Sequence, residues 1–320
     1  MKNLDQQVIE QTLEWCYADE TVWLCTVLAT YGSSPRPPGA MLAAKADGNY
    51  IGSLSGGCVE EDFLTRLTKG ELNLPKQIIK FGESDHDRQR LGLPCGGVLE
   101  VLVEQLTPNH ENKTLFSNLV QGQKNQQTLI RCIELQGDNW HLTTAPNISS
   151  EIERTQQSIR IPIGPSRRLI IAGISTVANI CAQFAKTLGF EVIVCDPREE
   201  VQADFNSTGI EFKPILPSMF IANGGCHEAT AVVALTHDPR FDDLTMIEAV
   251  RTNAYYIGVM GSKKTSAVRA ERLQRIGGLS RSEIERIRMP IGLNIGSRTP
   301  AEIALSVMAD ILKTQNLQRK

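Results

Sequence analysis

The stretch RLIIAGISTVANICAQFAKTLGFEVIVCD, residues 168–196, decides the fold of the C-terminal half of this chain. It opens with a short apolar run, continues through a helix-like segment at residues 177–188 that Gly189 ends, and closes with a second apolar run. Strand, helix and strand in this order predict a βαβ unit with a right-handed crossover. We therefore predict a doubly wound parallel sheet for this half.

The turn after the first of these strands is similar to a dinucleotide-binding fingerprint. Residues 173–178 lie where G-x-G-x-x-[GA] would lie, and Asp196 follows about twenty residues later, where an acid binds a ribose hydroxyl. Ser175, however, replaces the second glycine, whose missing side chain lets a pyrophosphate approach the backbone. The pattern predicts a Rossmann-like fold and leaves NAD(P) or another nucleotide as an alternative ligand. Its candidate contacts are Gly173, Ser175 and Asp196.

Two later loops of this half follow apolar runs that we interpret as strands. In open α/β sheets ligands bind outside the carboxyl ends of strands, so both loops are candidate sites. His237, in the first loop, could act as an acid or a base, and a hydrogen bond to the neighbouring loop is the alternative. Gly261 and Ser262, followed by Lys263 and Lys264, favour an anion such as a phosphate.

The N-terminal half mixes helices and strands in another order. Its pattern predicts helices over residues 4–18 and 59–69, strands over 21–29, 76–81 and 98–106, and two hairpins, around Asp47-Gly48 and around residues 137–139. Residues 146–166 have weak periodicity and are the candidate linker. We predict an α+β domain over residues 1–160 and a Rossmann-like domain over residues 161–320.

The segment Ser55-Gly56-Gly57-Cys58 stands directly before a predicted helix. The first backbone N–H groups of a helix are unpaired and carry the positive end of its dipole. The two glycines would let an anion come close to them, and a cysteine at such a position is more ionised at neutral pH. A thiolate serves as nucleophile, sulfur carrier or soft metal ligand. The alternative is a small buried residue in a tight turn.

A second cysteine turn and one arginine complete the candidates of this half. Cys95, Gly96 and Gly97 repeat the arrangement at the start of a predicted strand, without the helix. Arg36 stands in the proline-rich stretch 32–39, where it could pair with an anionic ligand or form a surface salt bridge. We predict that Cys58 and Cys95 are candidate catalytic residues, and that Cys58 is also a candidate metal contact. The candidates for binding are Arg36, Ser55, Gly56, Gly57, Gly96 and Gly97.

The length, composition, net charge and cysteine spacing of the chain argue against several classes of protein. The chain has 320 residues, 41% of them hydrophobic and 22% charged, which is typical of a two-domain globular protein. A net charge of −3 argues against nucleic-acid binding. No apolar run is long enough to span a membrane and the polar N-terminus has no signal core, so we expect a cytoplasmic location. The eight cysteines contain no C-x-x-C pair, which argues against a disulfide framework or a zinc knuckle.

Several motifs resemble the XdhC/CoxI family, accessory proteins of molybdenum hydroxylases such as xanthine dehydrogenase. They are GSSPRPPGAM (32–41), GSLSGGCVE (52–60), CGG (95–97), THD (236–238), YIGVMGS (256–262), PIGL (290–293) and TPAEIA (299–304). The family's Rossmann loop usually reads Gly-Ala-Gly-His-Val-Ala, and here Ser175 and Thr176 replace its second glycine and its histidine.

The resemblance implies a chaperone rather than a metabolic enzyme. Family members bind molybdenum cofactor (molybdopterin), protect it while an oxo ligand is exchanged for a sulfido ligand, and deliver it to the apo-hydroxylase. A cysteine desulfurase and a second copy of the chain are further partners that the resemblance implies. Two alternatives stay open: an NAD(P)-dependent oxidoreductase with His237 as proton carrier, and a nucleotide-sensing scaffold without chemistry.

Overall fold

A computed structural model of the chain describes residues 4–31, 36–84, 87, 97–137, 140–144, 151–201, 205, 209–236 and 238–318. Asn3–Pro165 and Ser166–Lys320 form two compact units, called here the N-terminal and the C-terminal unit. Among the described residues, no helix is long and apolar enough to cross a membrane.

The N-terminal unit is built on two antiparallel sheets. The larger has the order β3-β2-β1-β5-β4 and the smaller the order β7-β6-β9-β8. The elements are α1 (Leu4–Tyr17), β1 (Val22–Tyr31), β2 (Met41–Lys45), β3 (Tyr50–Gly52), α2 (Cys58–Thr68), β4 (Lys76–Phe81), β5 (Val98–Leu106), α4 (His110–Lys124), β6 (Leu129–Glu134), β7 (Trp140–Thr144), β8 (Glu153–Arg154) and β9 (Ser158–Ile163).

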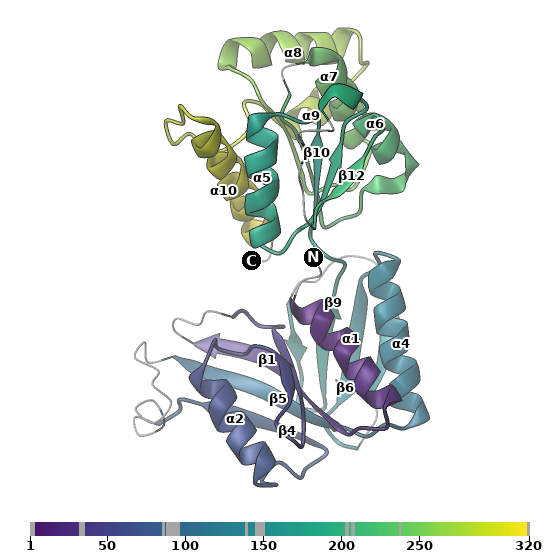
Figure 1. The fold of residues 1–320 in the computed structure, drawn as a ribbon, viewed down its shortest axis with the longest axis vertical. Helices are drawn as coiled ribbons and strands as arrows, with labels where there is room; N and C mark the ends of the chain where they lie inside the picture. Colours follow the sequence, from purple (N-terminus) through teal and green to yellow (C-terminus); the bar gives the residue numbers. More distant parts are fainter. Residues whose placement is uncertain are drawn as a thin grey trace. The chain divides into compact units, whose positions relative to one another are not determined.

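Strand β1 is buried on both faces, because each face of the larger sheet is covered. Val22 and Leu24 point to a core shared with α1, α4 and the smaller sheet. Trp23 and Cys25 point the other way, toward the buried side chains of α2. Side chains alternate along a strand, so the apolar run of β1 serves two cores. Figure 1 shows α1 and α4 side by side and α2 on a separate part of the unit.

The stretch predicted as a linker, residues 146–166, contains two strands instead. Glu153–Arg154 forms β8, and Ser158–Ile163 forms β9, which pairs with β6 along its whole length. Ile159 and Ile161 are fully buried, while Arg160 between them is exposed. This alternation of apolar and polar residues is a strand signal, so the prediction of a linker over residues 146–166 was wrong.

The C-terminal unit is a parallel six-stranded sheet with the order β12-β11-β10-β13-β14-β15. Its elements are β10 (Arg168–Ala172), α5 (Thr176–Thr187), β11 (Glu191–Cys195), η1 (Glu199–Val201), β12 (Glu211–Lys213), α6 (Pro217–Phe220), η2 (Ile221–Gly225), β13 (Thr230–Ala234), α7 (Pro239–Ala249), β14 (Tyr256–Val259), α8 (Lys263–Arg275), α9 (Arg281–Glu285), β15 (Ile287–Arg288) and α10 (Pro300–Gln318).

This strand order confirms the predicted doubly wound fold. The chain runs outward from β10 to β12, returns to β13 and runs outward on the other side, so the order reverses between β10 and β13. Helices α5 and α10 cover one face of the sheet, where Figure 1 shows them side by side, and α7 and α8 pack on the other. Ligands of this fold bind at the carboxyl ends of the strands near that reversal.

Candidate functional site

The candidate residues of the N-terminal unit gather at one end of its larger sheet. Tyr31, the last residue of β1, pairs with Val98, the first residue of β5. The same end holds the start of β2 and, at Gly52, the end of β3. The turn before α2, the stretch before β2 that holds Arg36, and Gly97 before β5 therefore all lie at this end. Cys95 and Gly96 lie outside the described residues.

The turn before α2 is organised around the carboxylate of Glu60. Its Oε1 accepts hydrogen bonds from the backbone N–H groups of Leu54 (2.8 Å), Ser55 (2.9 Å) and Gly56 (2.9 Å), and from the Ser53 hydroxyl (2.8 Å). Its Oε2 accepts from the Gly57 N–H (2.9 Å) and the Ser55 hydroxyl (2.7 Å). The amides predicted to receive an external anion thus bind a carboxylate of the chain itself.

Glu60 is buried and ionised. Burial alone would raise the pKa of this carboxyl, but the hydrogen bonds from Ser55, Gly56 and Ser53 outweigh it and hold the pKa well below its ordinary value. Gly56 has a φ of +94°, which side chains rarely adopt, so the turn requires glycine there. This role of Glu60 was not predicted from the sequence. A glutamate three residues after an N-cap is the signal that could have found it.

Cys58 is the first residue of α2 and is exposed, unlike most other cysteines that the structure describes. Cys16, Cys25, Cys132, Cys181 and Cys195 are buried, and Cys226 is half-buried. Burial raises the pKa of Cys16 to about 11 and the pKa of Cys181 to about 12, so these thiols stay protonated. The alternative interpretation of Cys58 as a small buried residue was wrong, and its sulfur is open to a ligand or a partner.

Arg36 has partners inside the unit. Its guanidinium donates to Asp5 Oδ1 of α1 (2.7 Å) and to the Ser53 carbonyl oxygen (3.3 Å). Asp5 also accepts the N–H of Met41, at the start of β2 (2.9 Å). Arg36 therefore connects α1 to the turn that precedes Cys58, which corresponds to the salt-bridge alternative.

In the C-terminal unit, side chains of the same unit pack against the turn after β10 and bind its backbone. Gly173 has a φ of +83°, and a Cβ there would lie 2.0 Å from the Thr236 methyl carbon. Asp196 Oδ2 accepts the N–H of Ile174 (2.7 Å), and both its oxygens receive bonds from the Arg198 guanidinium. Burial would raise the pKa of Asp196, but the bonds from Arg198 and Ile174 lower it. The acid predicted to bind a ribose is thus paired within the unit.

Ser175 is the N-cap of α5. Its Oγ accepts the N–H of Ala178 (3.1 Å) and donates to the carbonyl oxygen of Leu235 (2.7 Å), after β13. Ser175 therefore uses its hydroxyl to begin the helix and to hold two strand ends together. This explains the departure from the glycine pattern without reference to a ligand.

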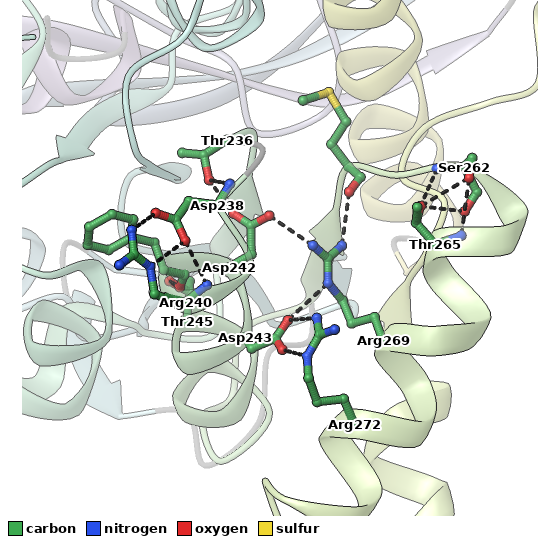
Figure 2. Close-up of polar contacts among 12 residues, drawn as sticks. Thr236, Asp238, Arg240, Asp242, Asp243, Thr245, Ser262, Thr265, Arg269 and Arg272 are labelled. Carbon is green, nitrogen blue, oxygen red and sulfur yellow. Dashed lines mark hydrogen bonds and ion pairs between the residues drawn. The ribbon is translucent and has the colours of Figure 1, made fainter.

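The loops after β13 and β14 are linked by one arginine. Arg269 of α8 donates to the Met260 carbonyl oxygen (2.9 Å), to Asp242 (2.9 Å) and to Asp243 (3.0 Å), as Figure 2 shows. Asp242 also accepts the hydroxyl of Thr236 (2.6 Å). Burial raises the pKa of Asp242 to about 6, although Thr236 and Arg269 oppose that rise. His237 lies outside the described residues.

Ser262 is the N-cap of α8. Its Oγ accepts the N–H of Thr265 (3.1 Å), and the Ser262 N–H donates to the Thr265 hydroxyl (2.7 Å). Gly261 and Ser262 thus lie at the entry to this helix, and hydroxyl groups rather than a carboxylate cap it. Over the described part of the chain, no three His, Cys, Asp or Glu residues gather to hold a metal ion.

Comparisons with known proteins place both halves of the chain in one family. The model of the XdhC Rossmann domain matches residues 169–311, and the model of the XdhC and CoxI family matches residues 15–69. The second match includes the turn before Cys58. The first includes the Gly173, Asp196 and Gly261 loops.

Two curated relatives are similar over nearly the whole chain. A probable xanthine dehydrogenase subunit of Bacillus subtilis is 27% identical, and the match covers 92% of this chain and 94% of the relative. The molybdenum cofactor insertion chaperone PaoD of Escherichia coli is 26% identical, with coverage of 90% and 81%. A solved structure of a xanthine dehydrogenase from Bacillus halodurans has the same fold, with a TM-score of 0.76, 23% identity, and coverage of 100% and 97%.

Proposed function

We propose that this chain, which belongs to the XdhC and CoxI family, binds molybdenum cofactor and inserts it into an apo molybdenum hydroxylase such as a xanthine dehydrogenase. The relative named as a molybdenum cofactor insertion chaperone supports this role, because the similarity extends over 90% of the chain. The Bacillus subtilis relative, whose name refers to xanthine dehydrogenase, supports the type of partner.

The observation that carries the proposal is the exposed Cys58 thiol on a fixed turn. Molybdenum cofactor arrives with its own dithiolene ligands, so a carrier needs a soft contact rather than a full set of metal ligands. Cys58 can offer one sulfur from the first turn of α2. The six hydrogen bonds to Glu60 hold the preceding backbone in place. In this proposal Ser55, Gly56 and Gly57 position the thiol.

We propose further that the thiol contact protects the metal while its oxo ligand is exchanged for a sulfido ligand. A cysteine desulfurase would then be the partner that supplies the sulfur. Cys95, before β5, is a second candidate thiol for this step. These finer roles are separable from binding, since a variant can bind the cofactor and still deliver it without the sulfido ligand.

The test compares the full chain with its Cys58→Ser variant. The protein is mixed with molybdenum cofactor, and three quantities are measured: bound molybdenum and pterin, the activity of an apo-hydroxylase after transfer, and the cyanide-releasable sulfur of that enzyme. We expect Cys58→Ser to lower transfer at least about tenfold, since loss of one good ligand contact costs about 1.4 kcal/mol or more.

A matched control changes Glu61, an exposed residue of the same first turn, to alanine. Glu61→Ala should bind and transfer as the parent chain does. Normal binding, transfer and sulfuration by Cys58→Ser would contradict the thiol contact. Normal binding with loss of cyanide-releasable sulfur alone would place Cys58 in sulfuration rather than in cofactor capture.

The dinucleotide alternatives have weaker support. A dinucleotide that used Asp196 would compete with Arg198 for both carboxylate oxygens, and the Ser175 side chain stands where the fingerprint has glycine. Titration of the protein with NADH and NADPH, followed by thermal unfolding, tests these alternatives. Saturable stabilisation with turnover of a carbonyl substrate would favour the oxidoreductase, and stabilisation without turnover would favour the nucleotide-sensing scaffold.

A further inference from the structure

We propose a binding site for a phosphoryl group at the start of α8, formed by the backbone N–H groups of Gly261, Lys263 and Lys264 and the hydroxyl of Ser266. It lies in the C-terminal unit and does not depend on the function proposed above. Helix α8 has 13 residues and follows β14, so its first turn lies at the carboxyl end of a parallel strand. That edge of the sheet is where this fold binds its ligands.

The first observation is the charge of this helix start. Helices α2, α9 and α10 carry a glutamate at the third position, and each carboxylate accepts backbone N–H groups that precede its helix. The residues are Glu60, Glu283 and Glu302. Helix α8 has Thr265 at this position and has no acidic residue in its first turn. Lys263 and Lys264 beside it are exposed, so the turn presents N–H groups and two positive charges without an internal anion.

The second observation is an unpaired hydroxyl beneath the turn. Ser266 is 5% exposed, and its Oγ has no hydrogen-bond partner among the residues that the structure describes. The Oγ lies 3.5 Å from the point where a Cβ on Gly261 would stand, so it faces the bare backbone of that glycine. A buried hydroxyl without a partner costs free energy, and an oxygen of a bound ligand would pair it.

The backbone of Gly261 lies close to the side chains of α8. A Cβ at Gly261 would lie 2.8 Å from the Thr265 hydroxyl and 3.7 Å from Nη1 of Arg269. A side chain at this position would clash with the Thr265 hydroxyl, so the turn requires glycine there. The turn is also held in advance, because Arg269 binds the Met260 carbonyl while Asp242 and Asp243 fix the guanidinium (Figure 2). Such preorganisation lowers the cost of binding.

The chemistry favours a phosphoryl group. Its tetrahedral oxygens can accept several N–H groups and one hydroxyl at once, and its charge is balanced by the two lysines. A free nucleotide and the phosphate of molybdopterin are two sources of the same group. Competition with each of these ligands distinguishes the two sources.

The test titrates the full chain with inorganic phosphate at constant ionic strength, with chloride as the reference anion. Binding is followed by calorimetry and by the amide NMR shifts of residues 261–264. We expect Ser266→Ala to weaken phosphate binding about tenfold, and Lys263→Ala with Lys264→Ala to weaken it by a similar factor. Without phosphate, Ser266→Ala should be as stable as the parent chain or more stable, because it removes an unpaired buried hydroxyl.

The matched control is Ser297→Ala, which removes a hydroxyl near the start of α10, where Glu302 occupies the turn. Its phosphate affinity should equal that of the parent chain. Unchanged affinity in both Ser266→Ala and the double lysine variant, or amides 261–264 that do not respond to phosphate, would overturn the site.

Competition then identifies the source of the phosphoryl group. A nucleoside monophosphate that displaces phosphate at lower concentration supports a free nucleotide, and displacement by molybdenum cofactor supports the cargo. Cys58→Ser should bind phosphate normally, so failure of the thiol proposal and failure of this site are distinguishable.

Discussion

The starts of α2 and α8 are alike in sequence and different in structure. Ser55-Gly56-Gly57 precedes the first helix and Gly261-Ser262 the second, so small residues lead into both. In α2, Glu60 fills the turn with a carboxylate that is 5% exposed. In α8, the hydroxyl of Ser262 accepts the N–H of Thr265, and the hydroxyl of Thr265 accepts the N–H of Ser262. The hydroxyl of Ser266 has no partner among the described residues.

We infer from this difference that a glycine-rich turn before a helix is open to an external anion only when the chain has no anion of its own for it. The deciding residue is the third of the helix, where a glutamate can reach back to the turn. By this criterion the turn at α2 is a rigid support for Cys58, and the turn at α8 is the one prepared for a ligand.

The largest expected effect comes from removing the carboxylate of α2. Glu60→Ala would leave four backbone N–H groups and two hydroxyls without their acceptor. Because water can reach part of the turn, we expect a loss of about 3 kcal/mol in the free energy of unfolding rather than the full sum. Urea unfolding measures it. The exposed neighbour Glu61→Ala should lose less than about 0.5 kcal/mol, and equal losses in the two variants would contradict the role of Glu60.

The second prediction concerns pH, because the acids beside the two turns act in opposite directions. The pKa of Glu60 is lowered, so its stabilisation is complete above its ordinary value of 4.5 and is lost as the pH falls below it. The pKa of Asp242 is raised to about 6, so its contribution to stability increases as the pH falls from about 6 toward 3.8.

Two variants separate these contributions. Between pH 7 and pH 5, the parent chain should gain about 1.3 kcal/mol relative to Asp242→Asn, whose stability lacks this titration. Below pH 4.5 the parent chain should lose stability faster than Glu60→Gln. Urea unfolding over a pH series measures both slopes, and parallel curves for parent and variants would refute the assignment.

The smallest effect is expected from giving α8 the acid that α2 has. Thr265→Glu places a carboxylate at the third position, where it can accept the N–H of Ser262 as Glu60 accepts that of Gly57. We expect the phosphate affinity to fall about tenfold, with a gain in stability of about 0.5 kcal/mol. Calorimetric titration with phosphate gives the first value. Thr265→Gln, which adds no charge, should show a smaller loss of affinity, and an unchanged affinity in Thr265→Glu would contradict an open anion site there.

The fold of the C-terminal unit follows from local pattern, and part of the N-terminal unit does not. Residues 168–196 contain whole buried strands around one helix, and such a βαβ unit has one preferred hand. The strand Ser158–Ile163 was missed because it is short and has Pro162 close to its end, although its buried isoleucines alternate with other residues. Its pairing with β6 brings together residues that are far apart in the sequence.

The residues of the candidate sites likewise include some that local sequence predicts and some that it does not. The glycines, Cys58 and Ser175 could be found from the sequence, because helix starts and turns have local signals. The hydrogen-bond acceptors of Arg36 and Ser175 could not be found from the sequence. Asp5 lies 31 residues before Arg36, and Leu235 lies 60 residues after Ser175, and no local pattern relates them.

The amino-acid sequence by itself determined the doubly wound sheet, the place of Cys58 at a helix start and the family resemblance, because periodicity and turn residues act over a few positions. Only the tertiary structure decided which turn already holds an anion. That depends on where the side chains of Glu60, Asp196 and Ser266 point after packing. Hydrogen bonding to a buried carboxylate or hydroxyl is set by three-dimensional proximity and burial, which sequence spacing does not record.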